Sequence, residues 1–135
     1  MRFEGRIWKD GRDWLVEVPM LDLMTQGRSR KQALAMIVDA IDSLANKQHF
    51  RATVHRIDDD RIEVGSNDAG LLTALMLRRQ REAHGLSLAE VSRRLGQSSR
   101  NAYARYERGA STPTIDHLQK LISIVTGRDF VLRPA

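Results

Sequence analysis

One short stretch decides the fold of the C-terminal half of this chain, and it reads GLSLAEVSRRLG over residues 85–96. Ser87 is suited to cap a helix, and Glu90 stands three residues later, where a capping box requires a carboxylate. Leu88, Val91 and Leu95 recur at the spacing of one helical face. Gly96 then frees the backbone for a tight turn. The stretch therefore predicts a short amphipathic helix that ends in an abrupt turn toward another helix.

Helical patterns flank this stretch on both sides. Residues 71–84 form a helical pattern that stops at Gly85, and residues 98–108 form another that stops at Gly109. A further helix is expected over residues 115–125, with Thr114 as its cap and Gly127 as its terminator. Phe130-Val131-Leu132 is a candidate last strand. Residues 67–135 are therefore predicted to form an all-α domain with one candidate C-terminal strand.

The 85–96 stretch resembles the second helix and turn of the phage-repressor (Xre) family of helix-turn-helix proteins. Leu77-Arg78 and Arg81 are similar to that family's first helix. Tyr106-Glu107-Arg108-Gly109 and Pro113 are similar to the close of its recognition helix and the start of the next one. The resemblance covers roughly residues 71–127. It implies a domain that places the helix after the turn in the major groove of DNA.

Polar side chains near the start of that helix are the candidate DNA contacts. Arginine pairs with guanine and asparagine with adenine, whereas serines at a helix start suit phosphate. Arginines at the end of the preceding helix are expected to meet the phosphate backbone. The predicted DNA-binding residues are Ser98, Ser99, Arg100, Asn101, Arg105, Arg93 and Arg94.

The spacing between Gly96 and Gly109 is one residue longer than is usual in the resembled family. Counting back from Glu107 selects Arg100 and Asn101 as the base-reading pair. Counting forward from Gly96 selects Ser99 and Arg100 instead. The sequence leaves both registers open.

Charge is distributed unevenly along the chain. Residues 1–66 contain 11 Lys/Arg and 11 Asp/Glu, whereas residues 67–135 contain 11 Lys/Arg and 6 Asp/Glu. The formal net charge of +5 therefore belongs to the second half. A cationic surface confined to the helical half favours an anionic partner such as operator DNA.

The N-terminal half shows strand patterns around one helix. Residues 2–9 and 12–18 alternate in polarity across the turn pair Asp10-Gly11, and residues 21–25 follow as a third strand. A helix is expected over residues 30–47, with Ser29 as cap and Gln32 completing a capping box. Residues 52–57 and 61–64 read as a second hairpin. The turn formers at residues 65–68 mark the boundary between a domain over residues 1–66 and a second over residues 67–135.

The N-terminal half resembles the HicB antitoxin family. The similar segments are Phe3-Glu4-Gly5-Arg6-Ile7, Trp14-Leu15-Val16-Glu17-Val18-Pro19, and Thr25-Gln26-Gly27 before the helix. The resemblance implies a partial RNase H-like β-β-β-α-β(-β) domain, so the expected fold class is α+β followed by the helix-turn-helix domain. It also implies an antitoxin of a type II toxin–antitoxin pair that binds a HicA-like ribonuclease toxin and represses its own operon.

Two alternatives remain open: a stand-alone repressor whose N-terminal domain binds a ligand or mediates dimerisation, and a nuclease. A working RNase H site needs several carboxylates converging on divalent metal. The available carboxylates are Glu4, Glu17, Asp22, Asp39 and Asp42. Strand phase predicts that Glu17 faces water, and pairs three apart on a helix, such as Asp39 and Asp42, usually do the same. Asp58-Asp59-Asp60 reads as a hairpin turn, and the histidines show no ligand spacing. The prediction is therefore no enzyme, no catalytic residue, no metal and no cofactor.

The remaining expectations concern location and assembly. The chain has no cysteine and no signal-peptide pattern. It also has no apolar run of the roughly 20 residues that a membrane span needs. These features predict a cytoplasmic protein with no membrane partner. A single recognition helix reads few base pairs, so a homodimer or higher homo-oligomer is expected on DNA. Phe130-Val131-Leu132 is the candidate contact between copies.

Overall fold

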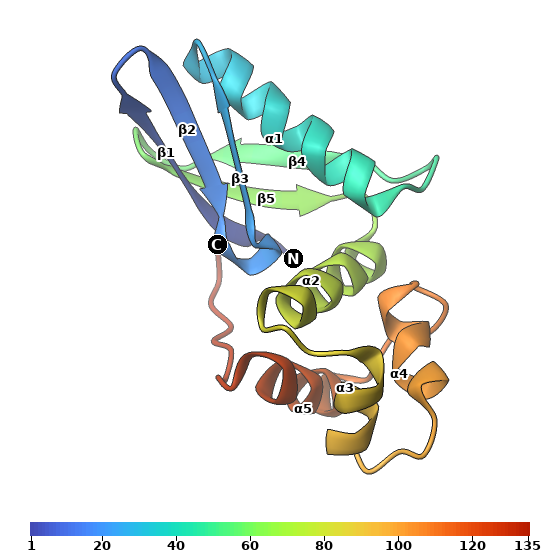
Figure 1. Cartoon of the computed structure of the whole chain (residues 1–135). Coiled ribbons are helices and arrows are strands. Elements are labelled where there is room, and N and C mark those ends of the chain that lie inside the picture. The colour runs from blue at the N-terminus through green and yellow to red at the C-terminus, as the bar shows by residue number, and fades with distance from the viewer. The chain divides into compact units, whose positions relative to one another are not determined.

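The computed structural model describes residues 1–135, and the chain divides into two compact units. We call Met1–Leu72 the sheet unit and Thr73–Ala135 the helical unit. The division falls within the first turns of α2 (Ala69–Ala83), just after the turn at residues 65–68. The predicted α+β class is confirmed, because a sheet packed with one helix is followed by a run of helices (Figure 1).

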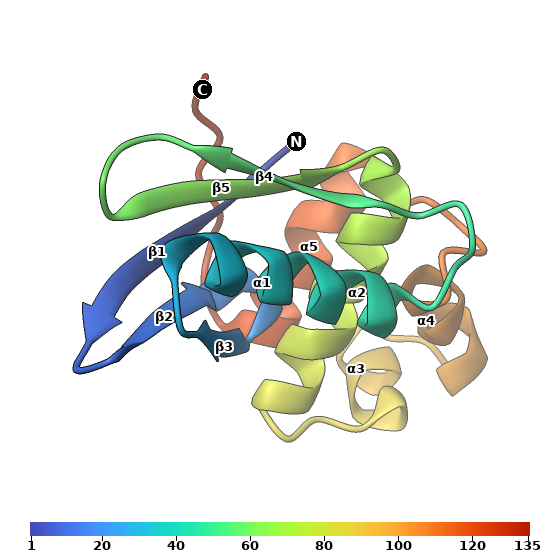
Figure 2. The ribbon, with the colours of Figure 1, turned by 90° about the horizontal axis from the view of Figure 1, so that it is seen from above.

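The sheet unit is built on five antiparallel strands. They are β1 (Phe3–Asp10), β2 (Asp13–Val18), β3 (Leu23–Gly27), β4 (Ala52–Arg56) and β5 (Arg61–Ser66). Their order across the sheet is β3-β2-β1-β5-β4, so β3 and β4 form the two edges. A 3-10 turn, η1 (Pro19–Leu21), separates β2 from β3, and α1 (Arg30–Ala45) connects β3 to β4. Figure 2 shows α1 lying along the sheet between these two edge strands, and α1 contacts both.

The core of the sheet unit lies between α1 and one face of the sheet. Ile7 pairs with Val16 across the β1–β2 ladder, and both are fully buried. The buried side of α1 is formed by Ala33, Ile37 and Ile41. Alternation along the strands places these residues on one face and leaves charged residues on the other, as period-2 patterning requires.

Gly5 is required where β1 meets its neighbours. A Cβ atom at this position would lie 2.7 Å from the Glu17 carbonyl oxygen. That oxygen belongs to the backbone of β2 and cannot move aside easily. The absence of a side chain at Gly5 therefore allows the strands of the central sheet to approach.

The ends of α1 follow the sequence except in one detail. The Ser29 side chain accepts a hydrogen bond from the Gln32 amide at 3.1 Å, which confirms the predicted cap. The Gln32 side chain, however, accepts from the amide of Arg28 at 2.7 Å instead of Ser29, so the predicted capping box is wrong. The glutamine side chain reaches one residue farther than a box requires. The helix ends at Ala45 with Asn46 in the left-handed conformation.

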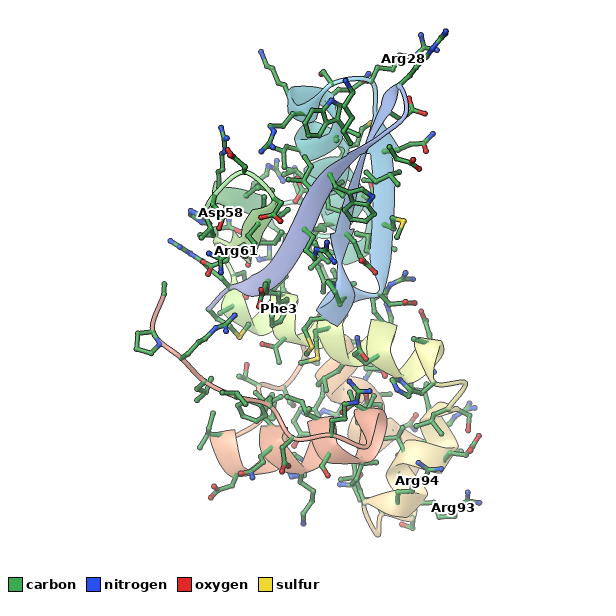
Figure 3. The ribbon with its side chains drawn as sticks, turned by 90° about the vertical axis from the view of Figure 1, so that its left-hand side faces the viewer. Phe3, Arg28, Asp58, Arg61, Arg93 and Arg94 are labelled. Atoms are coloured by element: carbon green, nitrogen blue, oxygen red, sulfur yellow. The ribbon has the colours of Figure 1, made fainter.

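The three aspartates between β4 and β5 form a turn, as predicted. Asp58 accepts from the backbone amides of Asp60 and Arg61, and its second oxygen accepts from the Arg61 guanidinium at 2.6 Å. Figure 3 labels this pair at the tip of the hairpin. The Arg61 side chain, together with these amides, lowers the pKa of Asp58 to about 2.

The helical unit contains the rest of α2 and three further helices: α3 (Leu88–Arg94), α4 (Arg100–Glu107) and α5 (Ile115–Thr126). Val91, Tyr103 and Leu121, one from each of these three helices, are fully buried. Thr114 caps α5 by accepting from the His117 amide, and Gly127 ends it at a φ of 70°, as the sequence predicts. Four helices around one small apolar core agree with the predicted all-α architecture.

The predicted strand at Phe130-Val131-Leu132 is wrong. Residues after Gly127 form no helix or strand. Val131 is 86% exposed and Leu132 is 76% exposed. A strand needs a neighbouring backbone to complete its ladder, and the helical unit contains no other strand with which this segment could pair.

Candidate nucleic-acid interface

The site begins with α3, whose first turn is closed by a complete capping box. The Glu90 amide donates to the Ser87 hydroxyl at 3.0 Å, and the Ser87 amide donates to the Glu90 carboxylate at 3.3 Å. The bond from the Ser87 amide is the main cause of the lowered pKa of Glu90. Val91 and Ser92 are buried on the inner side of the helix. The sequence prediction for this helix start is confirmed.

A tight turn connects α3 to α4. Gly96 adopts a φ of 75°, which lies in the left-handed region that glycine occupies without a steric penalty. Its amide donates to the Arg93 carbonyl at 2.9 Å, and the Gln97 amide donates to the Ser92 carbonyl at 2.9 Å. These bonds satisfy carbonyl groups at the end of α3 and turn the chain toward the next helix.

The start of α4 is set by a serine cap. Ser99 has an extended backbone, and its side chain accepts from the Asn101 amide at 3.2 Å, so Ser99 is the cap and Arg100 the first helical residue. Ser98 lies outside the helix, which corrects the predicted helix start. Arg100 and Asn101 occupy the first two helical positions, and which side chains read bases stays a prediction.

The two faces of α4 differ sharply. Tyr103 is fully buried and Ala104 is 6% exposed. Asn101 and Arg105 are four residues apart, so they share one helical face, and both are exposed. Arg100 projects from the exposed first turn. The helix thus packs through its middle and presents its polar start and outer face to solvent.

One buried ion pair holds the far end of α4. Arg81 near the end of α2 donates through Nε and Nη2 to the two carboxylate oxygens of Glu107, at 2.6 and 3.0 Å. Its third nitrogen donates to the Leu86 carbonyl at 2.9 Å. The Arg81 side chain is 13% exposed and that of Glu107 is 7% exposed. The Glu107 carboxylate raises the pKa of Arg81. One guanidinium therefore ties together α2, the loop before α3 and the end of α4.

The aromatic residues of α4 belong to the packing of the unit. Burial raises the pKa of the Tyr103 phenol, and the nearby Glu107 carboxylate adds to this effect. The Tyr106 ring lies 5.1 Å from the His117 ring of α5, measured between centroids. Both tyrosines therefore fix α4 within the unit.

All seven predicted DNA-binding residues are exposed, on α3, on α4 and in the turn between them. None of the four arginines, Arg93, Arg94, Arg100 and Arg105, has a carboxylate oxygen within the 4.0 Å of a salt bridge. Figure 3 shows the side chains of Arg93 and Arg94 extending away from the ribbon. Because α3 and α4 pack together, these unpaired cations flank the exposed start of α4.

Sequence reasoning missed the Arg81–Glu107 pair, although it noted both residues as parts of motifs. The two lie 26 positions apart, and no local pattern joins them. Gln80 and Ser92 are 9% and 2% exposed. Both polar side chains therefore lie in the packing of the helical unit.

No group of three or more His, Asp or Glu side chains is arranged to hold a metal ion. None of the helices combines the length and the apolar character that crossing a membrane requires.

A known family covers the helices described above. A helix-turn-helix family model matches residues 77–124, a range that contains α3, the turn and α4. No curated protein matches the chain. The matched segment is a helix-turn-helix DNA-binding domain, and its function is sequence-specific DNA binding in the regulation of transcription.

Proposed function

We propose that this chain is the antitoxin of a type II toxin–antitoxin pair: it binds and inhibits a HicA-like ribonuclease and represses its own operon. The observation that carries the DNA-binding part is the exposed start of α4, where Arg100 and Asn101 occupy the first helical turn beside unpaired cations. Support for the antitoxin part comes from the HicB resemblance of the N-terminal half, together with its observed β-β-β-α-β-β element order.

On DNA, the proposed roles follow from side-chain chemistry. Arg100 and Asn101 read base edges in the major groove, because their side chains form paired hydrogen bonds with guanine and adenine. Arg93, Arg94 and Arg105 bind phosphate groups that flank the groove. Ser98 and Ser99 add hydrogen bonds to phosphate near the helix start.

Binding of the full chain to the DNA upstream of its own gene tests the first part. Arg100→Ala should weaken binding to the cognate site by about 1–3 kcal/mol and relax preference at one base position. Arg128→Ala removes the same charge from an exposed residue beyond α5 and serves as the matched control. Equal losses in the two variants would show that only net charge matters and would contradict base reading at Arg100.

The toxin-binding part rests on the sheet unit. A ribonuclease presents a cationic surface to RNA, and a domain with exposed acidic residues can cover such a surface. Among the acidic residues considered from sequence, Asp42 accepts from the Ala52 amide and Asp58 is bound to Arg61, so both have structural partners. Asp39 and Asp60 are exposed, and we propose that they belong to the toxin-facing surface.

Co-expression of the full chain with a small neighbouring reading frame tests this part. Rescue of growth and co-purification of the two products are expected. The test variant combines Asp39→Lys with Asp60→Lys and should capture less toxin. Its DNA binding, which should stay unchanged, is the control measurement. If no neighbouring gene product binds the chain, a stand-alone repressor is the better function.

We further propose that the chain itself does not cleave RNA. Asp42 and Asp58 have structural partners within the sheet unit, and the proposal assigns the ribonuclease activity to the partner protein. Incubation of the purified chain with RNA and Mg²⁺ or Mn²⁺ tests this proposal. Metal-dependent cleavage that survives rigorous purification contradicts it.

A further inference from the structure

The outer edge of β3 is an unprotected strand edge. β3 pairs only with β2, and residues 23–27 make no hydrogen bond outside that ladder. The strand reads LMTQG and contains no charged residue and no proline. Met24 is 54% exposed on the outer face of the sheet. Natural proteins ordinarily protect such edges with charge, proline or a covering segment, because a free edge pairs with other strands.

The opposite edge of the same sheet is protected. The Ala52 amide at the start of β4 donates to Asp42 of α1 at 2.7 Å. Arg56 at the end of β4 forms an ion pair with Asp59 at 2.9 Å. β4 therefore has a side-chain partner at one end and a charged residue at the other. The difference between the two edges points to β3 as an interaction surface.

We infer that β3 pairs antiparallel with β3 of a second copy of this chain and joins two sheets into one. The strand is self-complementary, because two uncharged edges can meet without placing like charges opposite each other. The choice of a second copy over another partner rests on the proposed DNA-binding function, since one recognition helix reads only half of a typical operator.

The symmetric register follows from the length of the strand. With Thr25 at the centre, Thr25 faces the second copy's Thr25, and Met24 faces the second copy's Gln26. Residues directly opposite in an antiparallel ladder have Cα atoms about 4.5–5.5 Å apart. This separation lies within the range of about 4.4–6.8 Å over which a disulfide forms.

A single introduced cysteine tests the pairing, because the chain has no native cysteine. Thr25→Cys should form a covalent dimer under mild oxidation at low protein concentration, at least tenfold faster than the control. The control is Thr53→Cys, the same substitution at an exposed position of the protected edge strand β4. Crosslinking of Thr25→Cys at the rate of Thr53→Cys would overturn the inference.

Charge variants in the Thr25→Cys background test the register. Adding Met24→Lys and Gln26→Lys places lysines opposite lysines across the two-fold axis and should suppress crosslinking. Adding Met24→Lys and Gln26→Glu places lysine opposite glutamate and should restore it. Circular dichroism checks that each variant is folded, and equal crosslinking in the two charge variants would overturn the register.

These experiments are independent of the toxin and of DNA. Loss of crosslinking with intact operator binding would reject β3 pairing and leave the DNA-binding function standing. Normal crosslinking with no operator binding would contradict the DNA-binding function and would still support pairing through β3.

Discussion

Removal of the Glu107 carboxylate should destabilise the helical unit more than any exposed charge change. Glu107 accepts two charge-assisted hydrogen bonds from Arg81, and both side chains are largely buried. Breaking a buried pair typically costs about 3–5 kcal/mol, because the remaining charge loses its partner in a poorly solvated site. Arg81 keeps its bond to the Leu86 carbonyl, so we expect Glu107→Ala to cost about 3 kcal/mol.

Urea denaturation of the full chain, followed by circular dichroism, measures this cost. With a slope of about 1–1.5 kcal/mol per molar urea, a loss of about 3 kcal/mol lowers the midpoint by about 2–3 M. Glu82→Ala is a matched control, because Glu82 lies 3.8 Å from the same arginine but is 47% exposed. That exposed contact should contribute less than about 1 kcal/mol.

A paired variant separates the effect of the charge from the effect of packing. Arg81→Met with Glu107→Leu leaves no buried charge and should recover more than half of the loss caused by Glu107→Ala. The reasoning is refuted if Glu107→Ala changes stability no more than Glu82→Ala does. The same variants report on function, because weaker anchoring of α4 should reduce operator affinity.

Three further predictions follow from local structure. Arg93→Ala should weaken binding to all DNA sequences alike and reduce the slope of log affinity against log salt concentration by about one unit. Titrations at several salt concentrations measure this slope, and an unchanged slope means that Arg93 does not contact phosphate. Gly96→Ala should lower the free energy of unfolding by about 1–2 kcal/mol, as measured by thermal unfolding. The φ of 75° disfavours a Cβ atom, although no atom lies within 4 Å to clash with it. An unchanged free energy would mean that the turn has another conformation. The pKa of Asp58 is lowered, so its contribution to stability is present above pH 3.8 and is lost as the pH falls through about 2. Carboxyl-carbon NMR should give this pKa in the native chain and a clearly higher value in Arg61→Ala, because the guanidinium is the largest cause of the shift.

Local signals in the sequence determined most of the secondary structure and indicated where the candidate site lies. Caps and turns depend on residues within a few positions of one another, so Ser29, Ser87 and Thr114 marked helix starts that the structure confirms. The same locality indicated a helix-turn-helix segment, which the family match over residues 77–124 supports. Apolar alternation likewise predicted the two hairpins and the α+β class.

Tertiary structure alone decided features that join distant residues or depend on geometry in space. The order β3-β2-β1-β5-β4 leaves β3 as one edge of the sheet, and no pattern within β3 indicates that position. The Arg81–Glu107 pair forms because packing brings α2 and α4 together across 26 positions.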